Sequence, residues 1–280
     1  MIVALHGLTT RHCTLLTDIR IAKETGYQGI EIVGAKLRRY LDTGHRLDRL
    51  LPLFDDLPPV GLGYVQDIER QGPEEYTALL RECEEICALA GQIGRPMVQL
   101  LTGPLDPTGS YKGIGDRSWP EVRALTAKNL KAIGDIGQRH GVCFYLEPLA
   151  FAHLHKLEQA LQVIDDAERD NIGLVIDFWH MWDSGATPDQ IARLDKRYIF
   201  CAHVCDSLEA NGDRGGPDQR GRDVWPGGGR IPIKEWVDAV LATGFDGWWS
   251  CELLSPKYWE LDPWTTARDL REHFVRYMLV

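Results

Sequence analysis

The hydrophobic pattern alternates between two kinds of segment along the whole chain. Short apolar runs of strand length are each followed by a segment in which apolar residues recur every three or four positions, the spacing of an amphipathic helix. Eight such pairs follow one another. We predict strands over roughly residues 2–7, 29–34, 60–66, 97–103, 142–148, 172–180, 198–206 and 247–254, and helices that begin near Thr14, Arg38, Pro73, Trp119, Lys156, Thr187, Pro232 and Trp264.

Strand–helix repeats of this number build either a closed barrel or an open, doubly wound sheet. No Gly-x-Gly-x-x-Gly phrase follows the first apolar run, although such a phrase is typical of the open sheet. A closed barrel of roughly 250 residues would use nearly all of the 280 residues. The pattern therefore predicts one α/β domain over residues 1–280, a single (β/α)8 TIM barrel.

Four acidic or imidazole residues stand at the ends of four successive apolar runs. They are Glu147, Asp177, His203 and Glu252. If these runs are parallel strands of a barrel, their side chains converge at the carboxyl edge, whereas an open sheet would concentrate its site at one crossover point. Three carboxylates and one imidazole suit one divalent metal ion, first manganese or magnesium, with cobalt or zinc as alternatives.

Composition narrows the partners of such a domain. The formal net charge of −10 and the pI near 5.4 would repel a phosphate backbone, so we expect no nucleic-acid partner. The seven cysteines are scattered through apolar runs, as expected for reduced, buried thiols. The N-terminal stretch has no basic leader, and its apolar run is too short for a signal peptide or a membrane span. We therefore expect a cytoplasmic protein without a membrane partner.

The longest irregular segment, residues 206–231, is rich in Gly, Asp and Arg and follows the strand that bears His203. A loop of that length in a compact domain is usually functional or disordered. Placed over the metal, it would bring Arg222 within reach of a substrate oxygen. The alternative is a mobile surface loop whose arginines only interact with solvent.

Four histidines and one glutamate each allow a functional and a structural interpretation. His180 is a substrate contact or a packing residue beside Phe178 and Trp179, and His6 faces the pocket or bonds a neighbour. The pair His153 and His155 follows Glu147 closely and supplies an additional acid or base, or consists of ordinary loop histidines. Glu31, at the end of the second predicted strand, lines the pocket or caps the barrel rim.

Five phrases carry a resemblance to the sugar isomerase and epimerase superfamily with the xylose-isomerase-like barrel. They are LEPL at 146–149, VIDFWHMWDSG at 175–185, HVCDS at 203–207, RDVWPGGG at 222–229 and GFDGWWSCELLS at 244–255. The resemblance covers most of the chain. It implies that Glu147, Asp177, His203 and Glu252 bind one divalent metal, and that the two glutamates act as catalytic acid and base on opposite faces of a bound ketose. It also implies substrate contacts from His180 and Arg222.

Chemistry supports the same roles, because a metal that stabilises a developing enediolate makes the proton next to a sugar carbonyl removable by a carboxylate. Our first hypothesis is an isomerase or epimerase that acts on a sugar, cyclitol or keto-sugar. The resemblance also allows for a homo-oligomer, since homo-oligomers are common among such barrels. The sequence departs from the related ketohexose 3-epimerases, which follow Glu-Pro with Asn-Arg, where this chain has Leu149-Ala150. It also has Gly at the middle of Pro226-Gly227-Gly228, where many relatives place an acid or amide.

The isomerase hypothesis has three alternatives. The first is a lyase of the same superfamily, of the inosose-dehydratase or 3-oxo-glycoside type, with His153 or His155 as the second acid. The second, an abasic-site endonuclease-like hydrolase, needs many more histidines than nine and a basic surface. The third is a non-catalytic binding barrel, which requires that the metal site be vestigial.

Overall fold

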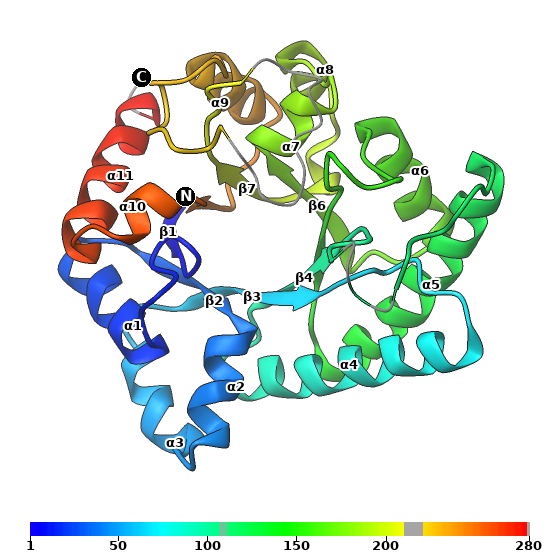
Figure 1. The fold of residues 1–280 in the computed structure, drawn as a ribbon, viewed down its shortest axis with the longest axis horizontal. Coiled ribbons are helices and arrows are strands. Elements are labelled where there is room, and N and C mark those ends of the chain that lie inside the picture. Colours follow the sequence, from blue (N-terminus) through cyan, green and yellow to red (C-terminus); the bar gives the residue numbers. More distant parts are fainter. Residues whose placement is uncertain (107–108, 110, 210–220, 279–280) are drawn as a thin grey trace.

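Eight parallel strands close into a barrel in which each strand pairs with its neighbours in chain order (Figure 1). The structure is a computed structural model that describes residues 1–106, 109, 111–209 and 221–278. The predicted barrel is thus confirmed. The strands are β1 (Ile2–His6), β2 (Gly29–Val33), β3 (Pro59–Val65), β4 (Met97–Leu101), β5 (Phe144–Glu147), β6 (Ile172–Asp177), β7 (Ile199–Val204) and β8 (Trp248–Cys251).

Helices surround the strands on the outside of the barrel (Figure 1). Within the described residues, none is both long and apolar enough to cross a lipid bilayer. The helices are α1 (Leu15–Glu24), α2 (Gly34–Asp42), α3 (Leu47–Leu50), η1 (Leu51–Phe54), α4 (Pro73–Gln92), α5 (Trp119–His140), α6 (Leu157–Ala167), α7 (Phe178–Asp183), α8 (Pro188–Ala192), η2 (Lys196–Tyr198), α9 (Ile233–Ala242), α10 (Pro256–Trp259) and α11 (Pro263–Met278).

Local sequence explains where the long helices start and stop. At the start of α5, the Glu121 carboxylate accepts a hydrogen bond of 2.9 Å from the Ser118 N–H, a contact of the capping-box type. At its end, Gly141 takes a left-handed conformation with φ 66°. A residue with a Cβ would be strained there, so the glycine ends the helix.

Side chains along β5, β6 and β7 alternate between the inside of the barrel and the layer of helices. Residues two apart on a strand point to the same face, so the side chains two positions before Glu147, Asp177 and His203 also point into the barrel. These side chains pack with Trp248 of β8 into a separate apolar cluster of Tyr145, Val175, Cys201 and Trp248. The intervening residues join the larger core shared with the helices. The inner cluster therefore forms an apolar floor. On β5, β6 and β7 the next inward position carries the candidate ligand, whereas on β8 Ser250 lies between Trp248 and Glu252.

The two ends of the chain meet to close the barrel. β1 pairs with β8, and the N-terminal helix α1 packs against the C-terminal helix α11 (Figure 1). The Tyr27 hydroxyl, just after α1, donates a hydrogen bond of 2.8 Å to the Ala267 carbonyl of α11. Closure brings His6 of β1 to the same edge as the end of β8, although more than two hundred residues separate them.

Most predicted strands are longer than the observed ones, and the sixth shows why. The apolar run predicted as a strand over 172–180 ends as a strand at Asp177, and helix α7 starts at Phe178. The Asp177 side chain accepts a hydrogen bond from the His180 N–H and so caps this helix. Phe178 and Trp179 continue the apolar run because they are buried on a helix rather than a strand. Helix α2 likewise begins at Gly34, directly after β2, and not near Arg38.

Candidate metal centre

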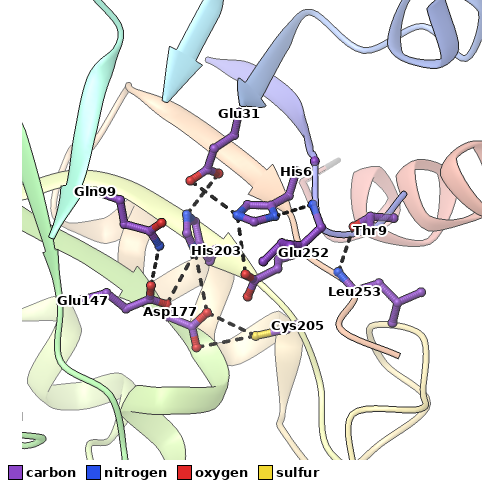
Figure 2. A network of polar contacts seen from close by, with 12 residues as sticks. His6, Thr9, Glu31, Gln99, Glu147, Asp177, His203, Cys205, Glu252 and Leu253 are labelled. Atoms are coloured by element: carbon purple, nitrogen blue, oxygen red, sulfur yellow. Dashed lines mark hydrogen bonds and ion pairs between the residues drawn. The ribbon is translucent and has the colours of Figure 1, made fainter. Parts of the chain in front are cut away.

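The structure brings the four candidate ligands together at the carboxyl edge of the barrel. Glu147 ends β5, Asp177 ends β6, His203 lies one residue before the end of β7, and Glu252 directly follows β8. Each offers one ligand atom, and these atoms all lie within 4.8 Å of one another (Figure 2). All four side chains are buried.

His203 lacks the hydrogen bonds that a buried imidazole needs. Its ring is fully buried, and neither Nδ1 nor Nε2 makes a hydrogen bond. Nδ1 lies 3.6 Å from Glu147 Oε1 and 3.8 Å from Asp177 Oδ2. Burial alone would lower the pKa of His203, but the carboxylates of Glu31 and Glu147 outweigh it and raise that pKa well above its ordinary value. A cation bound at Nδ1 would replace the proton there and supply the missing partner.

The charges around the centre also fit a cation. Burial, reinforced by the Glu147 carboxylate, raises the pKa of Asp177 to about 7. Burial would likewise raise the pKa of Glu252, but the Arg222 guanidinium and the imidazoles of His6 and His203 lower it to about 2. A buried group of oxygen ligands with one imidazole suits a divalent metal, and it does not select one ion among several.

Further contacts orient two of the carboxylates. The Asp177 Oδ1 atom accepts the His180 N–H at 2.7 Å, and the Cys205 thiol lies 3.5 Å from Oδ2. The Gln99 side-chain amide of β4 donates to Glu147 Oε2. These bonds limit the rotation of the two carboxylates, as expected of groups that hold ligands in place.

His180 faces the centre as a neutral donor. Its Nδ1 accepts the Ala150 N–H at 3.0 Å, so the ring proton sits on Nε2. Nε2 lies 3.8 Å from Glu147 Oε1. Burial lowers the pKa of His180 to about 4, which keeps the ring neutral at physiological pH. His180 thus presents an N–H group to the site from helix α7.

Arg222 reaches the centre from the segment between β7 and α9. Its Nη2 donates to Glu252 Oε2 at 2.7 Å, and its guanidinium lies 5.2 Å from the centroid of the Trp179 ring. Only 2% of the Arg222 surface is exposed. The Asp206 carboxylate accepts four backbone N–H bonds and thereby holds residues 227–231. This described part of the predicted loop is folded onto the site, while residues 210–220 lie outside the described residues.

The remaining candidates divide into two places. His6 Nε2 lies 3.5 Å from both Glu31 Oε1 and Glu252 Oε1, so His6 belongs to the centre. His153 and His155 instead line a cavity of about 630 Å³ together with Phe151. The Phe151 ring, which lines this cavity, also lies 6.0 Å from the His180 ring.

Sequence reasoning missed three residues that touch the centre. Gln99 and Cys205 contact the carboxylates, and Tyr145 donates to Glu31. A polar residue inside the apolar run MVQLL was the available sign for Gln99. Tyr145 lies two positions before Glu147 and so on the same face of the strand, which also could have been read from the sequence.

Comparisons with known proteins agree with the fold. The chain is 25% identical over 275 residues to the inosose isomerase of Bacillus velezensis, covering 94% of this chain and 92% of that protein. It is 26% identical over 176 residues to the 3-dehydroshikimate dehydratase of Bacillus anthracis, covering 61% of this chain and 59% of that protein. A solved structure of the IOLI protein with a bound zinc atom superposes with a TM-score of 0.90 at 24% identity, covering 99% and 98% of the two chains, and this likeness shows the fold alone.

A family model describes the same architecture and extends over nearly the whole chain. The model of the xylose isomerase-like TIM barrel matches residues 19–277. That range includes β2 to β8 and all four candidate ligands. The chain therefore belongs to the xylose isomerase-like TIM barrel family.

Proposed function

We propose that this protein is a divalent-metal-dependent isomerase that moves a proton next to the carbonyl of a cyclitol ketone or sugar. The observation that carries the proposal is the buried cluster of Glu147, Asp177, His203 and Glu252. The relatives named inosose isomerase, which align with 94% of this chain in the case of Bacillus velezensis, support an inosose as the first substrate to test.

These four residues would hold the cation. A divalent cation bound there stabilises the negative charge that develops on a carbonyl oxygen as the adjacent carbon loses its proton. Zinc is a candidate because a structural neighbour contains it, and manganese, magnesium and cobalt fit the same donor set.

Two carboxylates are available for the proton transfer. Glu147 and Glu252 come from β5 and β8, and Figure 2 shows them on either side of His203. In keeping with the family resemblance, we infer that a bound substrate would meet one of these carboxylates on each face. One glutamate would remove the proton from the carbon next to the carbonyl, and the other would deliver a proton to the former carbonyl carbon in an isomerisation, or to the opposite face of the same carbon in an epimerisation. In the isomerisation the proton of the neighbouring hydroxyl would also pass to the former carbonyl oxygen.

Three side chains would bind the substrate. The His180 Nε2–H and the Arg222 guanidinium donate hydrogen bonds to its oxygens, and His6 contributes from β1. Since Arg222 already donates to Glu252, it also keeps that carboxylate ionised and oriented.

A lyase is the second candidate. The chain is similar to a 3-dehydroshikimate dehydratase over 176 residues. The first step would be the same proton removal, and elimination follows when an acid protonates a leaving hydroxyl or glycosyl oxygen. His153 and His155 line the cavity beside Phe151 and would supply that acid.

The test is proton exchange in deuterated water. Protein loaded with manganese, magnesium, cobalt or zinc would be incubated with inososes, ketoses and 3-keto-glycosides, and products followed by NMR and mass spectrometry. We expect a product of unchanged mass apart from incorporated deuterium. Loss of water or of an aglycone would support the lyase instead.

Variants locate the activity. Glu147→Gln and Glu252→Gln should abolish exchange, whereas Glu69→Gln, at another buried glutamate, should retain it. If both glutamate variants exchange protons and bind metal as wild type does, the proposed site is wrong.

A further inference from the structure

We propose that Glu31 is a positioning residue of the metal centre, which holds the proton of His203 Nε2 so that Nδ1 faces the cation. The proposal rests on the metal centre described above. Glu31 lies on β2 and is only 1% exposed. Its Oε2 is 3.2 Å from His203 Nε2, on the opposite side of the ring from Glu147 and Asp177 (Figure 2).

The chemistry of imidazole explains why this carboxylate matters. A neutral imidazole carries one proton, and only the nitrogen without it can bind a metal. A carboxylate beside Nε2 favours the proton on Nε2 and leaves the Nδ1 lone pair for the cation. It also fixes the ring plane and makes Nδ1 a better donor. His203 Nε2 makes no aligned hydrogen bond in this structure, and Glu31 Oε2, 3.2 Å away, is an acceptor within reach of its N–H.

Glu31 is itself held by two donors. The Tyr145 hydroxyl donates to Glu31 Oε1, and His6 Nε2 lies 3.5 Å from the same oxygen. His6 Nδ1 accepts the Leu8 N–H at 3.1 Å, so its proton is on Nε2 and points at the carboxylates. The Oε1 atom is therefore occupied, and Oε2 is left for His203.

The third strand makes room for this arrangement. A Cβ at Gly61 would lie 2.8 Å from the Tyr145 hydroxyl oxygen and 2.9 Å from Glu31 Cγ. Both distances are too short for any larger residue without movement of this pair. The absent side chain at Gly61 is thus part of the support for His203.

A second metal site is the competing interpretation, because ligand atoms of His6, Glu31 and His203 also lie within 4.8 Å of one another. His203 Nε2 cannot both give its proton to Glu31 and bind a second cation while Nδ1 binds the first. The Tyr145 hydroxyl already uses one Glu31 oxygen. With one cation at His203 Nδ1 and Glu31 accepting the Nε2–H, both ring nitrogens have a partner. A second cation at Nε2 would displace that proton.

The decisive experiment compares Glu31→Gln with wild type by chelator competition for manganese and zinc. We expect one metal per chain in wild type and an affinity about 10- to 100-fold weaker in Glu31→Gln, the usual effect of losing such a partner. Glu69→Gln is the matched control, since Glu69 is also buried but accepts its hydrogen bond from the Gly103 N–H. Tyr145→Phe should weaken binding in the same direction but less.

A second readout does not need the metal. In protein labelled with ¹⁵N-histidine, the His203 Nε2–H proton should resonate far downfield, and it should move upfield in Glu31→Gln but not in Glu69→Gln. The proposal is overturned if the metal affinity of Glu31→Gln is within twofold of that of the wild type. It is also overturned if the wild type binds two metal ions per chain and Glu31→Gln binds one. If wild type binds no metal, the metal centre fails, and the Nε2–H shift alone decides whether Glu31 holds that proton.

Discussion

Replacing Asp206 with asparagine should loosen the segment that holds Arg222 over the metal centre. The two carboxylate oxygens of Asp206 each accept two backbone hydrogen bonds. Oδ1 accepts from Ser207 N at 2.7 Å and Ile231 N at 3.0 Å, while Oδ2 accepts from Gly227 N and Gly229 N, both at 2.8 Å. In Asp206→Asn, one oxygen becomes an NH2 group that faces two N–H donors, so two hydrogen bonds are lost.

The magnitude follows from the number of bonds. Hydrogen bonds to a charged group contribute roughly 1.5–3 kcal/mol each. The loss of two should therefore lower the free energy needed to open residues 227–231 by about 3–6 kcal/mol. The cost falls on local opening more than on global unfolding, because among the described residues the Asp206 carboxylate bonds this segment and its own neighbour. Since each 1.4 kcal/mol is a factor of ten, the open population should rise at least about 100-fold.

Hydrogen exchange measures that population directly. The amides of Gly227, Gly229 and Ile231 should exchange at least about 100-fold faster in Asp206→Asn, and kcat/KM should fall because Arg222 no longer stays on Glu252. The control is Asp246→Asn, at an exposed aspartate, which should change neither. Exchange within threefold of wild type at all three amides would refute the reasoning.

Three further predictions concern stability. Burial raises the pKa of Glu69 to about 8, above its unfolded value near 4.5, so this group stabilises the fold fully below about pH 4.5 and the stabilisation is lost as the pH rises through 8. Glu69→Gln should therefore be more stable relative to wild type at pH 8.5 than at pH 5 in urea denaturation, and an equal difference at both would contradict this. Lys36→Met should lower the free energy of unfolding by about 3–5 kcal/mol. The reason is that the buried Asp18 carboxylate, 2.7 Å from Lys36 Nζ, would lose its cationic partner. The double variant with Asp18→Asn should recover part of that loss, and no recovery would count against the pairing. Manganese at 100 times its Kd should raise the free energy of unfolding of the wild type by about 2.7 kcal/mol, and EDTA should remove this gain. In a thermal-shift assay, manganese should not stabilise Asp177→Asn. An equal response in the variant would remove Asp177 from the ligand set.

The parts of this structure that depend on short-range patterns could be predicted. Strand–helix alternation predicted eight strand–helix pairs, and the absence of a Gly-x-Gly-x-x-Gly phrase together with ligand-type residues after four successive runs favoured the closed barrel. The position of a residue after an apolar run predicted that Glu147 and His203 lie at one edge. The end of β6 could not be located, because Phe178 and Trp179 extend the apolar run while belonging to a helix. In a short apolar run, a hydrophobic residue looks the same whether it is buried on a strand or on a helix.

Contacts made by closure and by irregular backbone were beyond the sequence. Glu31 had two equal interpretations, since its partner Tyr145 is 114 residues away and meets it only across the closed barrel. The bond between Arg222 and Glu252 depends on a segment without regular structure, whose path is set by the Asp206 carboxylate. No periodicity describes such a path, so only the residue type of Arg222 could be read in advance.

The cap of helix α7 has a consequence for how this site can change during evolution. Asp177 Oδ1 is used to start the helix that carries His180, which leaves Oδ2 facing His203. The three-residue spacing between Asp177 and His180 is thus a folding constraint as well as a constraint on the proposed metal site. If the proposed metal were lost in a descendant, selection would still favour Asp, Asn, Ser or Thr at position 177, since these residues cap helices. Asn or Ser at this position, with His180 retained, would mark a barrel that has kept its fold after losing its chemistry.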